Sequence, residues 1–226
     1  MQINNSPKVL ALIPAYNEAR RVGEVVAGAR RHLPVLVVDD GSSDETASIA
    51  ARSGATVLAQ WPNQGKGAAL KAGFRRAIAE GYSAVVTLDA DRQHDPAEIP
   101  AFLQAYQERH ADLVVGQRDF SRIPLVRRIT NTVGRWTFSW AAGAPVPDNQ
   151  SGYRLIGLRL MEAMLESGEQ GFQFEVEMIV VCLQQGYKLA WVPIRAIYTG
   201  GGSHIHPLQH VVEFMRMLVQ TRKRMR

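Results

Sequence analysis

Residues 84–94 read Ala-Val-Val-Thr-Leu-Asp-Ala-Asp-Arg-Gln-His, and this stretch decides the fold. Its apolar, β-branched part predicts a short buried strand. The strand runs directly into two carboxylates, Asp89 and Asp91, which are separated by one small residue. Because alternate side chains of an extended chain point the same way, we expect both carboxylates to face one side.

The two carboxylates indicate a metal site. Neighbouring carboxylates repel each other unless a cation lies between them. Their oxygen atoms suit a hard divalent cation, Mg²⁺ or Mn²⁺, which completes its shell with water and substrate phosphates. The sequence therefore predicts a metal that holds a phosphorylated substrate at the carboxyl end of a strand. The alternative is a loop with two solvated acids, because Asp-x-Asp alone is a frequent tripeptide.

Apolar strands alternate with helical patterns through the first half of the chain. The predicted strands are residues 9–13, 35–38, 55–59 and 112–116, together with the apolar part of residues 84–94. This alternation predicts a parallel, doubly wound α/β sheet, in which ligands bind outside the carboxyl ends of the strands. Polar residues follow three of these strands, at 14–18, 39–41 and 89–91, so we expect the site there.

Two of the intervening helices begin with residues typical of a capping box. Ser42 and Glu45 have the required spacing in front of one helix. Asp95 precedes another helix, with Pro96 at its first position and Glu98 completing the box. We therefore expect these side chains to accept hydrogen bonds from the first turns of the two helices.

Lys66 lies in the polar loop Asn-Gln-Gly-Lys-Gly, residues 63–67, which leads into a helix. The loop lacks the spacing of a phosphate-binding P-loop. Two roles stay open for Lys66, a contact with a bound nucleotide or a solvated position in the loop.

The second half of the chain is less regular. Residues 122–142 are basic and rich in aromatic side chains. The expected elements are helices over 158–165 and 174–185, a strand over 189–194, a glycine-rich loop over 198–206 and a terminal amphipathic helix over 207–226. Because the sequence contains neither a linker nor an internal repeat, residues 1–226 are expected to form one domain.

The composition is that of a soluble globular protein. The 226 residues are 46% hydrophobic and 21% charged, with a formal net charge of +5 that favours anionic partners. Cys182 is the only cysteine, so an intrachain disulfide is impossible. Neither a signal-peptide core nor an apolar run long enough to span a membrane is present. We expect a cytoplasmic location, with or without peripheral contact at the inner face of the membrane.

The basic chain terminus has two open interpretations. Arg216, Arg222, Lys223, Arg224 and Arg226 oppose a single acid, Glu213, in the last twenty residues. An amphipathic helix with such a tail lies on anionic lipid, or it packs on the sheet and leaves the tail solvated. Nucleic acid is not expected as a partner, because no recognised binding motif accompanies the charge.

Three ordered motifs resemble family 2 glycosyltransferases, which have the GT-A (Rossmann-like) fold. They are Val-Leu-Ala-Leu-Ile-Pro-Ala-Tyr-Asn-Glu at 9–18, Val-Val-Asp-Asp-Gly-Ser-Ser-Asp at 37–44, and Asp89-Ala90-Asp91 with Gln93-His94. Within the family, the chain is most similar to the polyprenyl- or dolichyl-phosphate mannosyl- and glucosyltransferase branch. Residues 116–118, 150–154, 175–177 and 192–194 extend the resemblance to residues 8–220.

The resemblance implies a role for each matching residue. Pro14, Ala15, Tyr16 and Glu18 would line the nucleotide pocket, next to Asp39, and Asp40 would contact the base. Asp89, Ala90, Asp91 and Gln93 would form the site of the Mg²⁺ or Mn²⁺ ion and the donor diphosphate. Arg118 and Arg154 would meet phosphates or the acceptor. The nucleotide-binding half would cover about 8–118 and the acceptor-binding half about 119–206. Asp39 and Asp40 have an alternative role as caps of the following helix.

The resemblance implies an inverting, metal-dependent transfer of a hexose from a nucleotide sugar, of the GDP-mannose or UDP-glucose type, to a lipid acceptor. A polyprenyl phosphate is already an anionic nucleophile, so cations that position it matter more than a base. If the acceptor is a hydroxyl of a glycan or glycolipid, a base is required, and Asp148 is the candidate, with a turn or cap role as the alternative. A sugar nucleotidyltransferase and a non-catalytic nucleotide-sugar-binding module are the remaining alternatives.

Overall fold

The structure is a computed structural model that describes residues 7–119, 125–168, 174–195, 197 and 218–225, with only the backbone for residues 125–133. The strands are β1 (Val9–Ala15), β2 (Val35–Asp40), β3 (Thr56–Gln60), β4 (Ala84–Thr87), β5 (Leu113–Arg118), β6 (Arg154–Gly157) and β7 (Leu189–Ile194). The helices are α1 (Val22–Ala29), α2 (Thr46–Arg52), α3 (Lys66–Ala79), the 3₁₀ turn η1 (Pro96–Glu98), α4 (Ile99–Arg109), α5 (Leu125–Ala142), α6 (Leu158–Leu165) and α7 (Phe174–Gln184).

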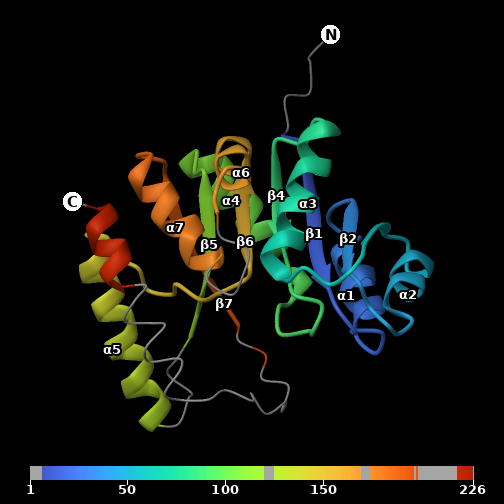
Figure 1. Cartoon of the computed structure of the whole chain (residues 1–226), viewed down its shortest axis with the longest axis horizontal. Helices are drawn as coiled ribbons and strands as arrows, with labels where there is room; N and C mark the ends of the chain where they lie inside the picture. Colours follow the sequence, from blue (N-terminus) through green and yellow to red (C-terminus); the bar gives the residue numbers. More distant parts are fainter. Residues whose placement is uncertain (1–6, 120–124, 169–173, 196, 198–217, 226) are drawn as a thin grey trace.

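The strands form one seven-stranded sheet in the order β3-β2-β1-β4-β6-β5-β7 (Figure 1). Strand β6 runs antiparallel to β4 and β5, and the other strands share one direction. The prediction of a single α/β domain with a mainly parallel sheet is confirmed. Strand β6 was not predicted, because it has only four residues and begins with an arginine, so its sequence carries neither alternation nor an apolar run.

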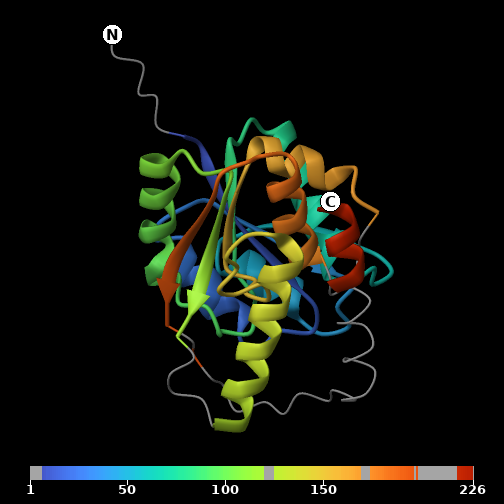
Figure 2. The same ribbon diagram turned by 90° about the vertical axis from the view of Figure 1, so that its left-hand side faces the viewer.

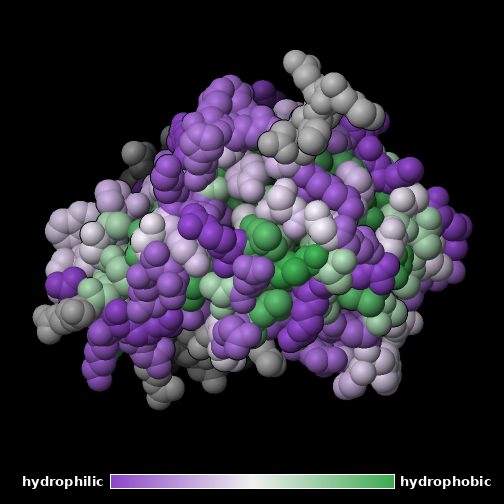
Figure 3. Space-filling view, turned by 90° about the horizontal axis from the view of Figure 1, so that it is seen from above, coloured by the Kyte–Doolittle hydropathy of each residue, from purple (hydrophilic) through white to green (hydrophobic). Residues whose placement is uncertain are grey.

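Both faces of the sheet are covered by helices, which explains why the inner strand β1 is apolar on both of its sides. In β1, Leu10 and Leu12 point into one core cluster, while Val9, Ala11 and Ile13 point into the other. Helices α3, α5, α6 and α7 contribute to the first cluster, and α1 and α4 contribute to the second. Figure 2 shows the sheet between these two layers. From above, hydrophilic residues cover most of the described surface (Figure 3).

One of the two predicted capping boxes is wrong and the other is half right. The Ser42 hydroxyl donates to Asp39 instead of capping, and Asp44 accepts the Thr46 N–H at 2.9 Å in its place. Asp95 does cap its helix, since its Oδ1 accepts the Ala97 N–H at 2.9 Å. Its partner in the box, Glu98, instead accepts the backbone N–H of Arg195 at 2.8 Å, so this carboxylate joins η1 to the residue after β7.

Residues 125–142 form the long helix α5, although the sequence of this region predicted no regular element. Arginines, threonines and exposed tryptophans interrupt its apolar pattern, but Phe138, Ala141 and Ala142 are all buried in the first core cluster. Burial of this one face against the rest of the domain stabilises the helix.

The sequence allows the C-terminal helix either to contact a membrane or to pack on the sheet. In the structure, residues 218–224 are helical and pack on the domain. Leu218 and Thr221 are buried there, and Arg224 forms a 2.6 Å ion pair with Glu177 of α7. Figure 1 shows this helix beside α5 and α7. The rest of the predicted helix, 207–217, and most of the glycine-rich loop lie outside the described residues. Across the described helices, none has the length and apolar character needed to cross a bilayer.

Candidate functional site

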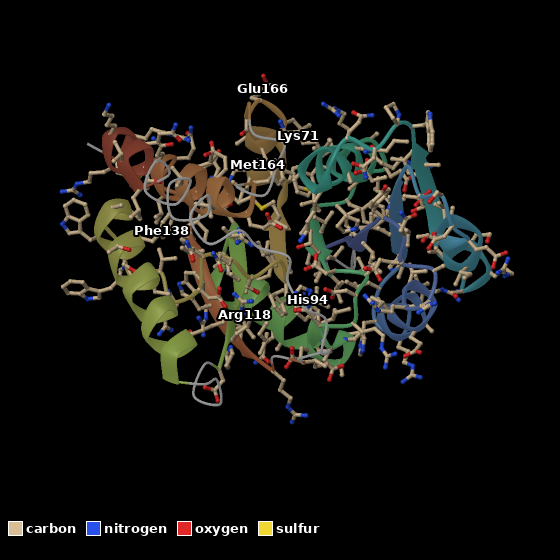
Figure 4. The ribbon with its side chains drawn as sticks, turned by 60° about the horizontal axis from the view of Figure 1, so that its bottom comes forward. Lys71, His94, Arg118, Phe138, Met164 and Glu166 are labelled. Carbon is tan, nitrogen blue, oxygen red and sulfur yellow. The ribbon has the colours of Figure 1, made fainter. Side chains whose placement is uncertain are left out.

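The predicted polar residues gather at one edge of the sheet, because the strands that precede them run in the same direction. Strands β1, β2, β4 and β5 deliver residues 14–18, 39–41, 89–91 and 118 to this edge. The loop 148–153 reaches it as well, because the antiparallel β6 begins there. Figure 4 views the molecule with this edge turned forward and shows His94 and Arg118 in it.

The centre of the edge is an ion-pair cluster of three residues from three elements. The Lys66 ammonium, at the start of α3, lies 2.6 Å from Asp89 Oδ1 and 2.8 Å from Glu175 Oε1 of α7. Burial alone would raise the pKa of Asp89, but the charge and hydrogen bond of Lys66, together with the nearby His94 and Arg118, lower that pKa to about 2. The two carboxylates in turn raise the pKa of Lys66 against the effect of burial. Asp89 and Lys66 are therefore both charged at neutral pH.

Gly152 packs directly against this cluster, where a side chain would not fit. A Cβ atom added at Gly152 would lie 2.9 Å from Asp89 Oδ2 and 3.0 Å from Lys66 Nζ. The backbone carbonyl of Gly152 accepts a hydrogen bond from the buried Thr87 hydroxyl at 2.7 Å, which fixes the loop to β4. The glycine therefore keeps the space next to the Asp89 carboxylate open to a small ion.

Asp91 lies in a turn rather than in an extended strand, so the predicted reason for its orientation is wrong. Strand β4 ends at Thr87, and residues 90–91 form a turn that is followed by Arg92 with a φ of +68°. The Asp91 carboxylate accepts the Gln93 backbone N–H at 2.9 Å and the Gln93 side-chain amide at 2.6 Å. Asp91 and Gln93 therefore form a local unit, and the buried Ala90 lies between this unit and Asp89.

His94 holds Asp89 in position, a role that the sequence did not predict. Its Nδ1 accepts the Asp89 backbone N–H at 3.0 Å, and its ring lies 5.0 Å from the ring of Tyr153. Burial lowers the pKa of His94 despite the nearby Asp89, so the ring is neutral at neutral pH. The only hint in the sequence was its place directly after Gln93.

Residues after β1 and β2 are tied together next to the cluster. The backbone of Asn17 has a φ of +54°. The Asn17 side-chain oxygen accepts the Ser43 N–H at 2.8 Å, and the Asn17 backbone N–H donates to the Ser42 hydroxyl at 2.9 Å. Glu18 forms a 3.0 Å ion pair with Arg21, and burial raises its pKa. The ring of Tyr16 is 51% exposed at this edge and is free to contact a ligand.

Asp39 and Asp40 are both buried, and neither caps α2. Asp39 accepts the Ser42 hydroxyl. Asp40 Oδ1 accepts the Gln64 N–H at 2.9 Å and the Gln60 amide at 2.5 Å, and its Oδ2 accepts the Gly65 N–H at 2.7 Å. Asp40 thus orders the loop that presents Lys66 to Asp89.

Arg118 and Asp148 form a bidentate ion pair at the end of β5. Arg118 Nε and Nη2 lie 2.8 Å and 2.9 Å from the two oxygens of Asp148, which is 2% exposed. Asp148 Oδ1 also accepts the backbone N–H groups of Gln150 and Ser151 at 3.2 Å each. The sequence allows Asp148 to act as a base or to order a turn, and this geometry favours the second role.

Arg154 is completely buried, so the predicted contact with phosphates or acceptor is not possible in this arrangement. Its guanidinium donates to three backbone carbonyls, those of Ser151 at 2.7 Å, Asn149 at 3.2 Å and Glu175. Burial lowers its pKa to about 10, so Arg154 is still charged at neutral pH. Arg154 is therefore a positioning residue that joins the loop before β6 to the helix that carries Glu175.

The donor set at Asp89 fits a hard divalent cation. Asp89 and Glu175 offer carboxylate oxygens to a single positive group, and Gly152 leaves room beside Asp89. Over the described ranges, three or more His, Cys, Asp or Glu side chains do not converge on one point.

Fold and site together define an α/β protein whose candidate ligand site lies at the carboxyl ends of its strands. The family model described as Glycosyl transferase family 2 matches residues 11–155. The chain belongs to this family and is a glycosyltransferase, as its motifs predicted.

Named relatives cover most of the chain. Undecaprenyl-phosphate mannosyltransferase of Micrococcus luteus is 34% identical over 83% of this chain and 82% of its own. Polyprenol monophosphomannose synthase of Mycolicibacterium smegmatis is 28% identical over 85% and 78% of the two chains. In fold, the chain resembles glucosyl-3-phosphoglycerate synthase from Mycobacterium tuberculosis, crystallised with Mn²⁺, UDP-glucose and phosphoglyceric acid, with a TM-score of 0.72, 21% identity and coverage of 95% and 78%.

Proposed function

We propose that this glycosyltransferase moves a hexose from a nucleoside-diphosphate sugar to a polyprenyl phosphate, with a divalent cation bound at Asp89. The names of the two relatives support a polyprenyl-phosphate acceptor. The observation that carries the proposal is the convergence of Asp89 and Glu175 on one positive group at the carboxyl edge of the sheet. The Mn²⁺ in the structural relative supports the same assignment.

The donor nucleotide is proposed to lie across the ends of β1 and β2. Tyr16 offers an exposed ring to the base, with Pro14, Ala15 and Glu18 beside it, and Asp40 lies at the end of the neighbouring strand. The donor diphosphate then lies over Asp89 and within reach of Lys66. A flexible lysine can follow phosphate oxygens as a mobile point charge.

The bound metal supplies a positive charge that stabilises the departing nucleoside diphosphate. Asp89 is the proposed ligand, and Asp91 with Gln93 would supply further oxygen atoms to the site. Arg118 is held by Asp148 at the same edge, and its charge acts on both Asp89 and His94. We assign Arg118 to the phosphates.

An acceptor phosphate requires no proton removal, because it is already an anion. The geometry at Asp148 agrees with this, since five donor groups from Arg118, Gln150 and Ser151 already bind its two oxygens. Asp148 therefore positions Arg118 in this proposal. If the acceptor is instead a hydroxyl of a glycan or glycolipid, Asp148 would have to leave Arg118 to act as the base.

The decisive test is a transfer assay with nucleotide sugars and polyprenyl phosphate in the presence of Mg²⁺ or Mn²⁺. Asp89→Asn and Asp91→Ala should each lower transfer by about a hundredfold or more, because they remove a ligand of the cation that stabilises the leaving group. Glu108→Ala, which changes an exposed acid on α4, is the matched control. Full activity in Asp91→Ala would show that Asp91 is not a metal ligand. Transfer to glycan hydroxyls alone would show that the acceptor is a hydroxyl and not a polyprenyl phosphate.

The donor is best identified by ligand-induced stabilisation. Each nucleoside diphosphate is tested for its effect on the melting temperature, with and without Mn²⁺. Binding raises apparent stability by mass action, so the preferred base and the metal requirement are measured together. If the donor is of the GDP-mannose type, GDP should raise the melting temperature. If the donor is of the UDP-glucose type, UDP should raise it.

We also propose that α5 and the C-terminal helix contact an anionic membrane, where a lipid-linked acceptor is found. Trp136 and Trp140 lie one turn apart on α5 and are 80% and 63% exposed. The Arg222 guanidinium lies 4.8 Å from the ring of Trp140, and Lys223 is exposed next to it. Exposed tryptophans beside cations are typical of surfaces that lie at the headgroup level.

A further inference from the structure

Lys66 occupies the position at which a cation would neutralise Asp89. Its ammonium lies between Asp89 and Glu175, at 2.6 Å and 2.8 Å. These distances are those of direct charge-assisted hydrogen bonds. A metal ion bound to the same oxygen of Asp89 would place a second cation beside the Lys66 ammonium, and the two positive charges would repel each other.

The Lys66 ammonium has the loop before β6 on one side. A Cβ atom added at Gly152 in this loop would lie 3.0 Å from Lys66 Nζ and 2.9 Å from Asp89 Oδ2. The Lys66 side chain is nevertheless 37% exposed, so it has an open path toward solvent at the edge of the sheet. Lysine carries its charge on a flexible four-carbon stem and can follow that path without a change in the backbone.

We propose that Lys66 blocks the cation position in the donor-free enzyme and leaves it when a diphosphate gives the ammonium a new anionic partner. The inference rests on the proposed function, because it takes Asp89 to be the metal ligand. A metal that binds alone must displace the ammonium from two carboxylates. A metal that binds together with a diphosphate does not leave the ammonium without a partner.

The consequence is positive coupling between metal and donor. Because coupling free energies are reciprocal, the donor diphosphate tightens the metal by the same factor by which the metal tightens the donor. Lys66 is then the residue that prevents the enzyme from holding a metal before the donor arrives. If Lys66 did not occupy the metal position, its removal without a change in the net charge of the cluster would leave metal binding unchanged.

The test measures Mn²⁺ binding to the full chain without nucleotide, by the loss of the electron paramagnetic resonance signal of free Mn²⁺. Lys66→Met should bind Mn²⁺ about tenfold more tightly than the wild type, within the usual range of coupling factors. Addition of UDP or GDP should tighten Mn²⁺ in the wild type and have a smaller effect in Lys66→Met. Lys188→Met, a change at an exposed lysine, is the control and should resemble the wild type.

A double variant separates occupancy of the position from a general charge effect. Lys66→Met combined with Glu175→Gln leaves Asp89 as the only charge of the cluster, so the net charge of minus one is the same as in the wild type. It also avoids two adjacent carboxylates without a partner, which keeps the test valid if the single variant does not fold. The double variant should still bind Mn²⁺ more tightly than the wild type.

The outcomes distinguish this inference from the proposed function. Nucleotide-dependent Mn²⁺ binding by the wild type, with no tightening in either Lys66 variant, overturns the inference and leaves the metal assignment intact. Failure of every variant to bind Mn²⁺, with or without nucleotide, overturns both. Tighter Mn²⁺ binding in the single variant but not in the double variant also overturns it, because charge alone would then explain the effect.

Discussion

A single buried side chain, His94, sets the position of the carboxylate on which the proposed chemistry depends. Its ring lies near Tyr153, which stacks on Phe102 at a centroid distance of 4.4 Å. In this position its Nδ1 accepts the Asp89 N–H at 3.0 Å. Since a protonated ring could not accept that hydrogen bond, the neutral form of His94 is part of the site's geometry.

The first prediction concerns pH. Burial lowers the pKa of His94 below its unfolded value, so the unfolded chain binds more protons as the pH falls from about 7 to about 5. The free energy of unfolding should therefore decrease over this range. His94→Asn keeps an acceptor for the Asp89 N–H but cannot titrate there, so its unfolding free energy should depend less on pH.

The measurement is urea unfolding at several pH values in the absence of divalent cations. His110→Asn is the matched control, because His110 is exposed and lies at a φ of +48°, which asparagine tolerates. The same pH slope in His94→Asn and the wild type would show that His94 does not contribute to the slope.

At the scale of elements, the site depends on how α3, β4 and α7 meet. The first residue of α3, the residues after β4 and the first turn of α7 supply the ion-pair cluster. The motif residues on β1, β2 and β4 could be predicted, because each follows an apolar strand. Glu175 was noted in the sequence as part of the resemblance, but its pairing with Lys66 joins residues 109 positions apart and has no local signature.

The second prediction concerns the C-terminal helix as a packing element. Leu218 is 7% exposed and belongs to the first core cluster, so Leu218→Ala should lower the free energy of unfolding by about 2 kcal/mol. Val219→Ala changes a residue that is 51% exposed and should cost less than about 0.5 kcal/mol. Equal effects of the two changes in chemical denaturation would contradict the observed packing of this helix.

At the scale of the whole molecule, the proposed donor site and the proposed membrane surface are on different elements. The donor site lies at the carboxyl edge of the sheet, while α5 and the C-terminal helix lie at one side of it (Figures 1 and 2). A lipid-linked acceptor could therefore be bound from the α5 side while the donor occupies the ends of β1 and β2.

The third prediction tests the membrane surface. Replacement of Trp136 and Trp140 by serine should weaken binding to phosphatidylglycerol-containing vesicles about tenfold, because two interfacial rings are lost. Cosedimentation with vesicles measures the binding. Comparison with uncharged phosphatidylcholine vesicles gives the contribution of the anionic lipid to this binding. Trp61→Ser is the control, since Trp61 is 78% exposed but lies on the loop after β3. Equal binding by the double variant and the wild type would contradict the assignment.

The sequence by itself determined the mainly parallel α/β fold, the family and the edge at which the polar motifs meet. It did so because apolar strands with polar ends are local patterns, and parallel strands bring their carboxyl ends together. Only the tertiary structure decided that Asp148 holds Arg118, that Arg154 is buried and that Lys66 lies between Asp89 and Glu175. Whether a charged side chain faces a ligand or another residue depends on contacts between segments far apart in the chain, which local sequence does not encode.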